Sequence, residues 1–133
     1  MATPSTQQLN CRIVLSYGSS LGNEVVLLDY TEATTTVGFQ KAIIPLELAA
    51  SATDQSVNLA SYFDTATFIA VIDRNNTGVL VGRTAGTSAR HNLAANGPFV
   101  YKNGAATPPT LYFDNSSASE KAFVEIIVMG TSA

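Results

Sequence analysis

Short segments rich in β-branched and aromatic residues, each followed by turn residues, recur along the whole chain and constrain its fold most strongly. The clearest is residues 67–73, an apolar run whose length and composition suit a strand covered on both faces. Residues 75–78, Asn-Asn-Thr-Gly, then form a turn signal ahead of the apolar residues 79–81. The sequence therefore predicts a β-hairpin over residues 67–81, at the centre of a sheet.

Similar segments lie on both sides of this hairpin, and the sequence has no pattern of a long helix. We expect further strands near residues 9–17, 24–30, 39–44, 56–59, 99–102, 111–113 and 122–129. Many short strands separated by turns are typical of an all-β protein, here an antiparallel β-sandwich of the jelly-roll or Greek-key type. We place this single domain at residues 9–130 and expect the polar residues 1–8 to be a flexible N-terminal arm.

Pro45 makes the middle of the chain harder to interpret. Because proline has no N–H to donate to a ladder, it is confined to edge strands, strand starts and bulges. We therefore interpret residues 39–44 as a strand and the residues after Pro45 as an edge segment or a short turn. Residues 46–50 also fit one helical turn.

The first expected strand alternates between apolar and polar residues. Its odd-numbered residues from Leu9 to Tyr17 are apolar, whereas Asn10 and Arg12 between them are polar. This alternation predicts a half-buried strand, followed by a loop at residues 18–23. Cys11 is the lone cysteine, so we interpret it as a small buried apolar residue of a protein made in a reducing cytosol.

The last expected strand is apolar on both faces. One row consists of Val124, Ile126 and Val128, and the other of Phe123, Glu125, Ile127 and Met129. A sandwich strand in a monomer needs only one apolar row, because its other row meets water. Either loops or another subunit cover the second row. Since monomers rarely expose large apolar patches, we favour the second and expect the chain to self-associate as a cyclic homo-oligomer, with a trimer favoured.

Charge and composition exclude several kinds of partner. The net charge is −3, only 13% of the residues are charged, and no cluster of Lys and Arg is present, so we expect no nucleic-acid binding. No segment approaches the roughly 18 consecutive apolar residues of a membrane span, so we expect no membrane partner. The polar N-terminus has neither the basic start nor the apolar stretch of a signal peptide.

No catalytic or cofactor motif is present, and we expect the protein not to be an enzyme. His91 is the only histidine, and a triad with Ser88 and an aspartate would lack the G-x-S-x-G elbow. We therefore interpret His91 as a loop residue with a structural hydrogen bond. One histidine and one cysteine do not make a transition-metal site, and the aspartates stand singly without a calcium-loop pattern. We predict no metal and no cofactor.

A glycan site is a second possibility, because sugar sites pair an aromatic face with Asp, Asn or Arg. Tyr62, Phe63, Tyr101 and Tyr112 are the candidate aromatics, although core or interface packing is the favoured role of Tyr101 and Tyr112. Arg74, Arg83 and Arg90 flank the central hairpin and are candidates for pairing with Asp73, Asp114 or a neighbouring subunit's carboxylates. The glycosylation patterns at Asn75 and Asn115 are interpreted as turns.

Four segments of the second half resemble small β-sandwich structural proteins of tailed-phage virions. They are residues 66–75, residues 90–97 with Arg-His-Asn-Leu-Ala-Ala-Asn-Gly, residues 109–115, and the final strand at 124–128. The resemblance covers residues 57–130. It implies a non-enzymatic virion component: a capsid decoration (cement) protein, or alternatively a part of the collar, tail or fibre.

The resemblance carries over no individual site residue. With the excess of apolar strand faces, it predicts a protein that is made in the host cytoplasm and binds its own copies and other virion proteins such as the major capsid protein. The residues expected at subunit or shell contacts are Phe123, Ile127, Met129, Arg74, Arg83 and Arg90. A glycan-binding β-sandwich module is the alternative from a different functional class.

Overall fold

The computed structural model describes residues 6–18, 25–37, 39–75, 77–86, 90–93, 98–103 and 107–132, which form ten β-strands and one short 3-10 helix. The chain divides into two compact units, Met1–Phe39 and Gln40–Ala133, whereas the sequence predicts one domain after a flexible arm. Within the described ranges, no helix has the length and apolar character needed to cross a membrane.

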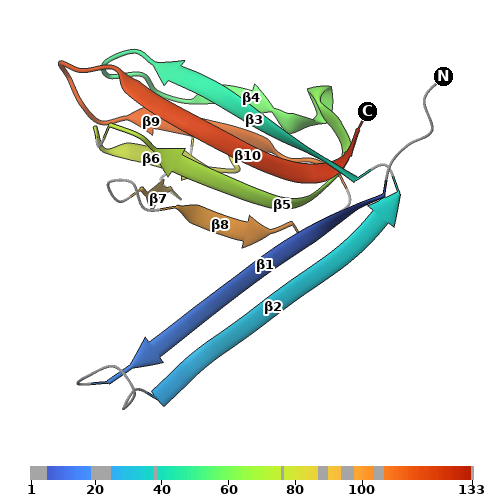
Figure 1. Ribbon diagram of the computed structural model, residues 1–133. Coiled ribbons are helices and arrows are strands. Elements are labelled where there is room, and N and C mark those ends of the chain that lie inside the picture. The colour runs from blue at the N-terminus through green and yellow to red at the C-terminus, as the bar shows by residue number, and fades with distance from the viewer. Residues whose placement is uncertain are drawn as a thin grey trace. The chain divides into compact units, whose positions relative to one another are not determined.

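The first unit is an antiparallel hairpin of β1 (Thr6–Tyr17) and β2 (Val25–Val37), which run side by side in Figure 1. We call this pair of strands the N-terminal hairpin. It begins inside the segment expected to be a flexible arm, of which residues 1–5 lie outside the described residues. Most of the loop expected at residues 18–23 also lies outside the described residues. The prediction of a half-buried first strand is wrong at its far end, where Leu15 is 56% and Tyr17 77% exposed.

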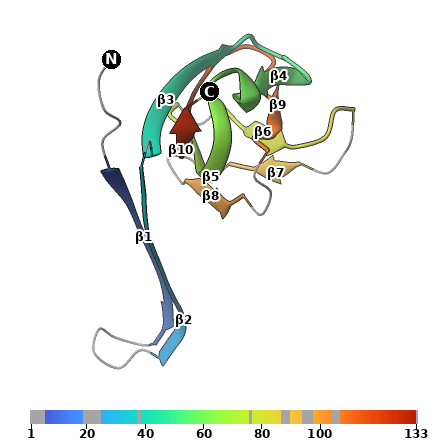
Figure 2. The ribbon, with the colours of Figure 1, turned by 90° about the vertical axis from the view of Figure 1, so that its right-hand side faces the viewer.

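The second unit consists of two four-stranded sheets, seen as two layers in Figure 2, and we call it the sandwich. The first sheet has the order β3 (Phe39–Leu48), β10 (Ala122–Ser132), β5 (Phe63–Asp73), β8 (Phe99–Lys102). The second has the order β4 (Gln55–Asn58), β9 (Thr110–Asn115), β6 (Val79–Gly82), β7 (His91–Asn92). The all-β antiparallel sandwich is thus confirmed.

The core lies between the sheets and follows from the two-residue period of the strands. In β10 every even-numbered residue from Ala122 to Gly130 is buried, and in β6 Val79 and Val81 are buried. Phe113 of β9 is fully buried as well. These side chains form one apolar cluster, and its burial is the main favourable contribution to folding.

The hairpin expected at residues 67–81 is wrong, because β5 and β6 belong to different sheets. The reason lies in Asn75. Its side chain donates to the carbonyl of Lys121 (2.7 Å) and accepts from the main-chain N–H of Phe123 (2.9 Å). These bonds attach the end of β5 to the start of β10 instead of closing a tight turn, and the chain then crosses to the second sheet.

Pro45 lies inside β3, which is an edge strand of the first sheet, as a strand proline requires. The strand continues to Leu48, so the helical turn considered for residues 46–50 is wrong. Among the described residues, the one helical turn is Leu59–Ser61, where the Asn58 side chain caps the N-terminus by accepting from the main-chain N–H of Ala60 (3.1 Å).

Candidate interaction surface

Each strand of the first sheet turns alternate residues away from the core, and together these residues form a largely apolar surface that we call the outer face. Its members are Lys41, Ile43, Pro45 and Glu47 of β3, Phe123, Glu125, Ile127 and Met129 of β10, Phe68, Ala70 and Ile72 of β5, and Val100 and Lys102 of β8.

The strand register aligns the apolar rows. Ile127 lies opposite Ala70, which in turn lies opposite Val100, and Met129 lies opposite Phe68. Directly opposed residues on one side of a sheet have adjacent side chains, so an apolar band crosses three strands. Sequence reasoning identified the β10 part of this band but missed its neighbours on β5, β8 and β3, because the pairing of strands cannot be read from alternation.

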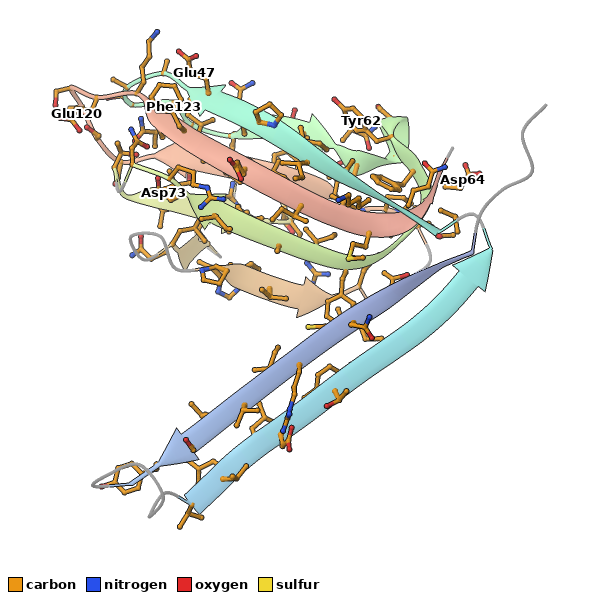
Figure 3. All side chains as sticks on the ribbon, viewed as in Figure 1. Glu47, Tyr62, Asp64, Asp73, Glu120 and Phe123 are labelled. Carbon is orange, nitrogen blue, oxygen red and sulfur yellow. The ribbon has the colours of Figure 1, made fainter. Side chains whose placement is uncertain are left out.

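Three residues of the outer face expose much of their apolar surface. Ile43 is 57%, Phe123 49% and Val100 36% exposed. Phe123 also lines a hollow of about 490 Å³ together with Pro45, Arg74 and Glu125. The hollow lies where the end of β3 meets the start of β10, and Figure 3 shows Glu47 and Phe123 at this end of the sandwich. A side chain from another molecule has room to enter here.

The charges beside the hollow are neutralised within the chain. Arg74 Nη2 lies 2.8 Å from Glu125 Oε2, and Lys121 Nζ lies 2.8 Å from Glu47 Oε1. The hydrogen bond to Glu125, reinforced by its charge, raises the pKa of Arg74. Glu47 raises the pKa of Lys121 in the same way. A molecule that covers the outer face therefore meets a largely apolar surface with paired charges beside the hollow and the exposed Lys41 and Lys102 elsewhere on the face.

The structure brings together four of the six contact residues expected from the sequence. Phe123, Ile127 and Met129 share the outer face, and Arg74 lies beside it. Arg83 is exposed but directly follows β6 of the second sheet, so it lies outside this surface.

Arg90 also lies apart from the outer face, with a side chain that is only 5% exposed. Its guanidinium pairs with Asp54 and lies 3.4 Å from Asp114, and it donates to the carbonyl of Thr84 at 2.5 Å. The guanidinium also lies 6.0 Å from the centre of the Tyr112 ring. The pairing of Arg90 with Asp114 is confirmed, and it ties the segment after β6 to the second sheet.

The aromatic residues considered for glycan binding do not form an open site among the described side chains. Phe63 is buried in the core, Arg90 lies over Tyr112, and Tyr62 stands at the end of the 3-10 helix. The side chain of Tyr101 lies outside the described residues. No open arrangement of an aromatic face with carboxylates or amides follows from these positions.

His91 stacks its ring on Phe99, with ring centres 4.7 Å apart and planes 27° apart. Ser88, its suggested partner in a triad, lies outside the described residues. In the part of the chain that the structure describes, no three His, Cys, Asp or Glu side chains gather in a way that would hold a metal ion. Cys11 is a half-buried free thiol in the N-terminal hairpin.

Both asparagines of the glycosylation patterns have structural roles. Asn75 joins β5 to β10 as described above. Asn115 is 3% exposed and donates to the carbonyls of Ala49 (3.1 Å) and Glu120 (2.8 Å).

Comparison of the chain with protein-family models, with curated proteins and with solved structures gives no match. The functional interpretation is therefore built on the geometry of the two units and on the resemblance in sequence pattern.

Proposed function

We propose that the protein is a non-enzymatic structural component of a phage particle, a capsid decoration protein that self-associates through the outer face and binds the shell. The observation that carries this proposal is the apolar band across β10, β5 and β8, with Ile43 and Phe123 exposed beside it. Phe68 of the band is already buried within the chain, so the uncovered apolar surface is mainly that of Ile43, Phe123 and Val100. Monomeric proteins seldom leave large contiguous apolar patches uncovered. Covering the exposed half of a Phe or Ile side chain contributes about 1 kcal/mol toward such a contact.

The strand pairing supports the proposal further. The eight sandwich strands pair first with last and so on inwards: β3 with β10, β4 with β9, β5 with β8, and β6 with β7. This nested pairing arises when one long antiparallel ribbon folds over into two layers, and we infer that the sandwich is a jelly roll. Jelly rolls recur in viral capsid proteins, although also in lectins and cupins, so the fold alone does not decide the function.

Native mass spectrometry over a range of protein concentrations tests the self-association. We expect an oligomer built from cyclic trimers. Phe123→Lys places a charge on the outer face beside the band and should yield a smaller species. Tyr62→Lys is the matched control, because Tyr62 is 50% exposed, against 49% for Phe123, and Figure 3 shows it at the opposite end of the sandwich.

A wild-type chain that stays monomeric at every concentration would refute the proposal, as would equal effects of the two variants. Co-sedimentation with phage particles tests the second half of the proposal. We expect the protein to sediment with capsids and the Phe123→Lys variant to bind more weakly, because shell sites then lack a preformed oligomer. Binding to isolated tails alone would favour the collar, tail or fibre instead, and binding to neither would exclude a virion role.

A further inference from the structure

The N-terminal hairpin carries an apolar surface of its own. Eight large apolar side chains of β1 and β2 are between 39% and 77% exposed. They are Ile13, Val14, Leu15, Tyr17, Val25, Val26, Leu27 and Leu28. A two-stranded hairpin is marginally stable in water unless one of its faces is packed against something. This surface is separate from the outer face, since it belongs to the other unit.

The ladder register shows that the hairpin has two unlike faces. Directly opposed residues share a face, so Ile13 with Tyr30, Leu15 with Leu28, and Tyr17 with Val25 lie on one side. We call this side the apolar stripe. It contains no charged residue from Ile13 to Tyr17 or from Val25 to Leu28.

The opposite side of the hairpin is polar near the middle of the strands. Arg12 lies opposite Thr31 there, and Val14 lies opposite Asp29. Arg12 and Asp29 form an exposed ion pair, with Nη2 3.3 Å from Oδ2. Val14 and Val26 are also exposed on this side, at 50% and 56%. The Arg12–Asp29 ion pair interrupts them, so the apolar stripe is the more continuous apolar surface and the one that most needs a cover.

We propose that two copies of the chain stack their N-terminal hairpins face to face, apolar stripe against apolar stripe, about a two-fold axis. Identical neutral surfaces meet without like-charge repulsion, and a two-fold contact uses the same patch on both copies. The exposed parts of the stripe amount to roughly 500 Å² per copy, and a pair therefore reaches the roughly 1,000 Å² that specific interfaces require. The opposite side of each hairpin, which carries the Arg12–Asp29 ion pair, stays in water.

The hairpin contact rests on the proposed self-association of the chain. It uses the N-terminal hairpin, whereas the outer-face contact uses the sandwich, so an experiment can test the two contacts independently. In the full chain carrying Phe123→Lys, the outer face is disabled and only the hairpin contact remains. We expect that variant to form a concentration-dependent dimer in analytical ultracentrifugation. If it is monomeric throughout, hairpin stacking is refuted while the outer-face proposal stands. If Phe123→Lys leaves the wild-type assembly unchanged, the outer-face proposal fails instead.

A matched pair of further substitutions tests whether only the apolar stripe of the hairpin forms the contact. Leu15→Lys and Val14→Lys change neighbouring residues that are 56% and 50% exposed and lie on opposite faces. Leu15→Lys places a charge in each half of the dimer, so we expect it to weaken the dimer more than about tenfold. Val14→Lys faces Asp29 across the ladder and should leave the dimer intact. Equal weakening by both variants would refute a one-sided contact.

The partner surface is identified by a photo-crosslinker. Benzoylphenylalanine in place of Tyr17, which is 77% exposed on the apolar stripe, reacts with whatever covers it. In a mixture of isotopically light and heavy chains, crosslinks between light and heavy hairpin peptides support the stacking. Crosslinks from the hairpin to sandwich peptides, in the same or another chain, overturn it. A far-UV spectrum and thermal melt like those of wild type show that the sandwich of each variant is folded.

Discussion

Gly130 offers the sharpest test of the packing between the two central strands of the first sheet. It lies in β10 at a register shift: Met129 is opposite Phe68, but Gly130 is opposite Ala66. β5 therefore bulges at Thr67, and the Thr67 carbonyl accepts from the main-chain N–H of Asn103 (2.8 Å). The bulge brings the two backbones so close that only glycine fits.

The magnitude follows from the contacts of an added methyl group. A Cβ on Gly130 would lie 1.9 Å from the Thr65 carbonyl oxygen and 2.9 Å from Ala66 Cα, whereas real Cβ contacts essentially never fall below 3.0 Å. Both neighbours are backbone atoms, so the strands must separate by about 1 Å. Overpacking costs about 1–3 kcal/mol, and one or two ladder hydrogen bonds weakened by the shift add about 1 kcal/mol each.

We therefore expect Gly130→Ala to lower the free energy of unfolding by about 3 kcal/mol, after the small gain from a stiffer unfolded chain is subtracted. For a unit of this size the melting temperature would fall by more than about 10 °C. Urea denaturation at one fixed protein concentration measures the change, because self-association makes the apparent stability concentration-dependent.

Gly86→Ala is the control for glycine replacement in general. No atom lies within 4 Å of its added Cβ, but its φ of +62° disfavours alanine, so we expect a loss of about 1–2 kcal/mol. If Gly130→Ala costs less than this control, the close approach of β10 to β5 is incorrect, and with it the register that aligns the outer face.

Three further predictions concern polar side chains. Asn115→Ala should cost about 2–4 kcal/mol in urea denaturation, because it removes the hydrogen bonds of a buried side chain to the carbonyls of Ala49 and Glu120 and from the main-chain N–H of Ser117; a cost below about 1 kcal/mol would contradict its burial. Arg90→Met should lower the free energy of unfolding by about 1–3 kcal/mol, a moderate loss because both carboxylate partners keep access to water. An unchanged free energy of unfolding would contradict a structural role of Arg90. Glu47 raises the pKa of Lys121 in the folded protein. The ion pair therefore stabilises the fold at pH values below the ordinary lysine pKa of about 10.4, and this stabilisation is lost as the pH rises through the raised pKa of the folded protein. Lys121→Met should thus flatten the fall in stability as the pH rises above about 10, and an unchanged slope would show that the pair contributes nothing.

Much of the architecture could be predicted because strand formation is a local property. The alternation of apolar and polar residues located most strands to within a few residues, including β8 (Phe99–Lys102) and the Pro-containing edge strand β3. The two apolar rows of β10 also predicted that one sandwich core would not cover every apolar side chain. These inferences need only the period of a strand and the chemistry of each side chain.

The candidate surface was only partly predictable, because its residues come from four strands that are distant in sequence. Phe123, Ile127 and Met129 were found from their own strand. Phe68 and Val100 became part of the same band only through the pairing of β5 with β10 and β8. Arg90 was expected at a contact, but the fold encloses it between two carboxylates.

By itself, then, the sequence determined the all-β class, the approximate strands and the surplus of apolar faces. Tertiary structure decided which strands became neighbours. Asn75 binds the start of β10, so β5 and β6 belong to different sheets although only a turn separates them. The apolar side chains at the far end of the N-terminal hairpin occupy consecutive positions, as in a strand covered on both faces, and are nevertheless exposed. The physical reason is that alternation records which residues avoid water, whereas the surface that covers them is chosen by hydrogen bonds and packing between distant segments.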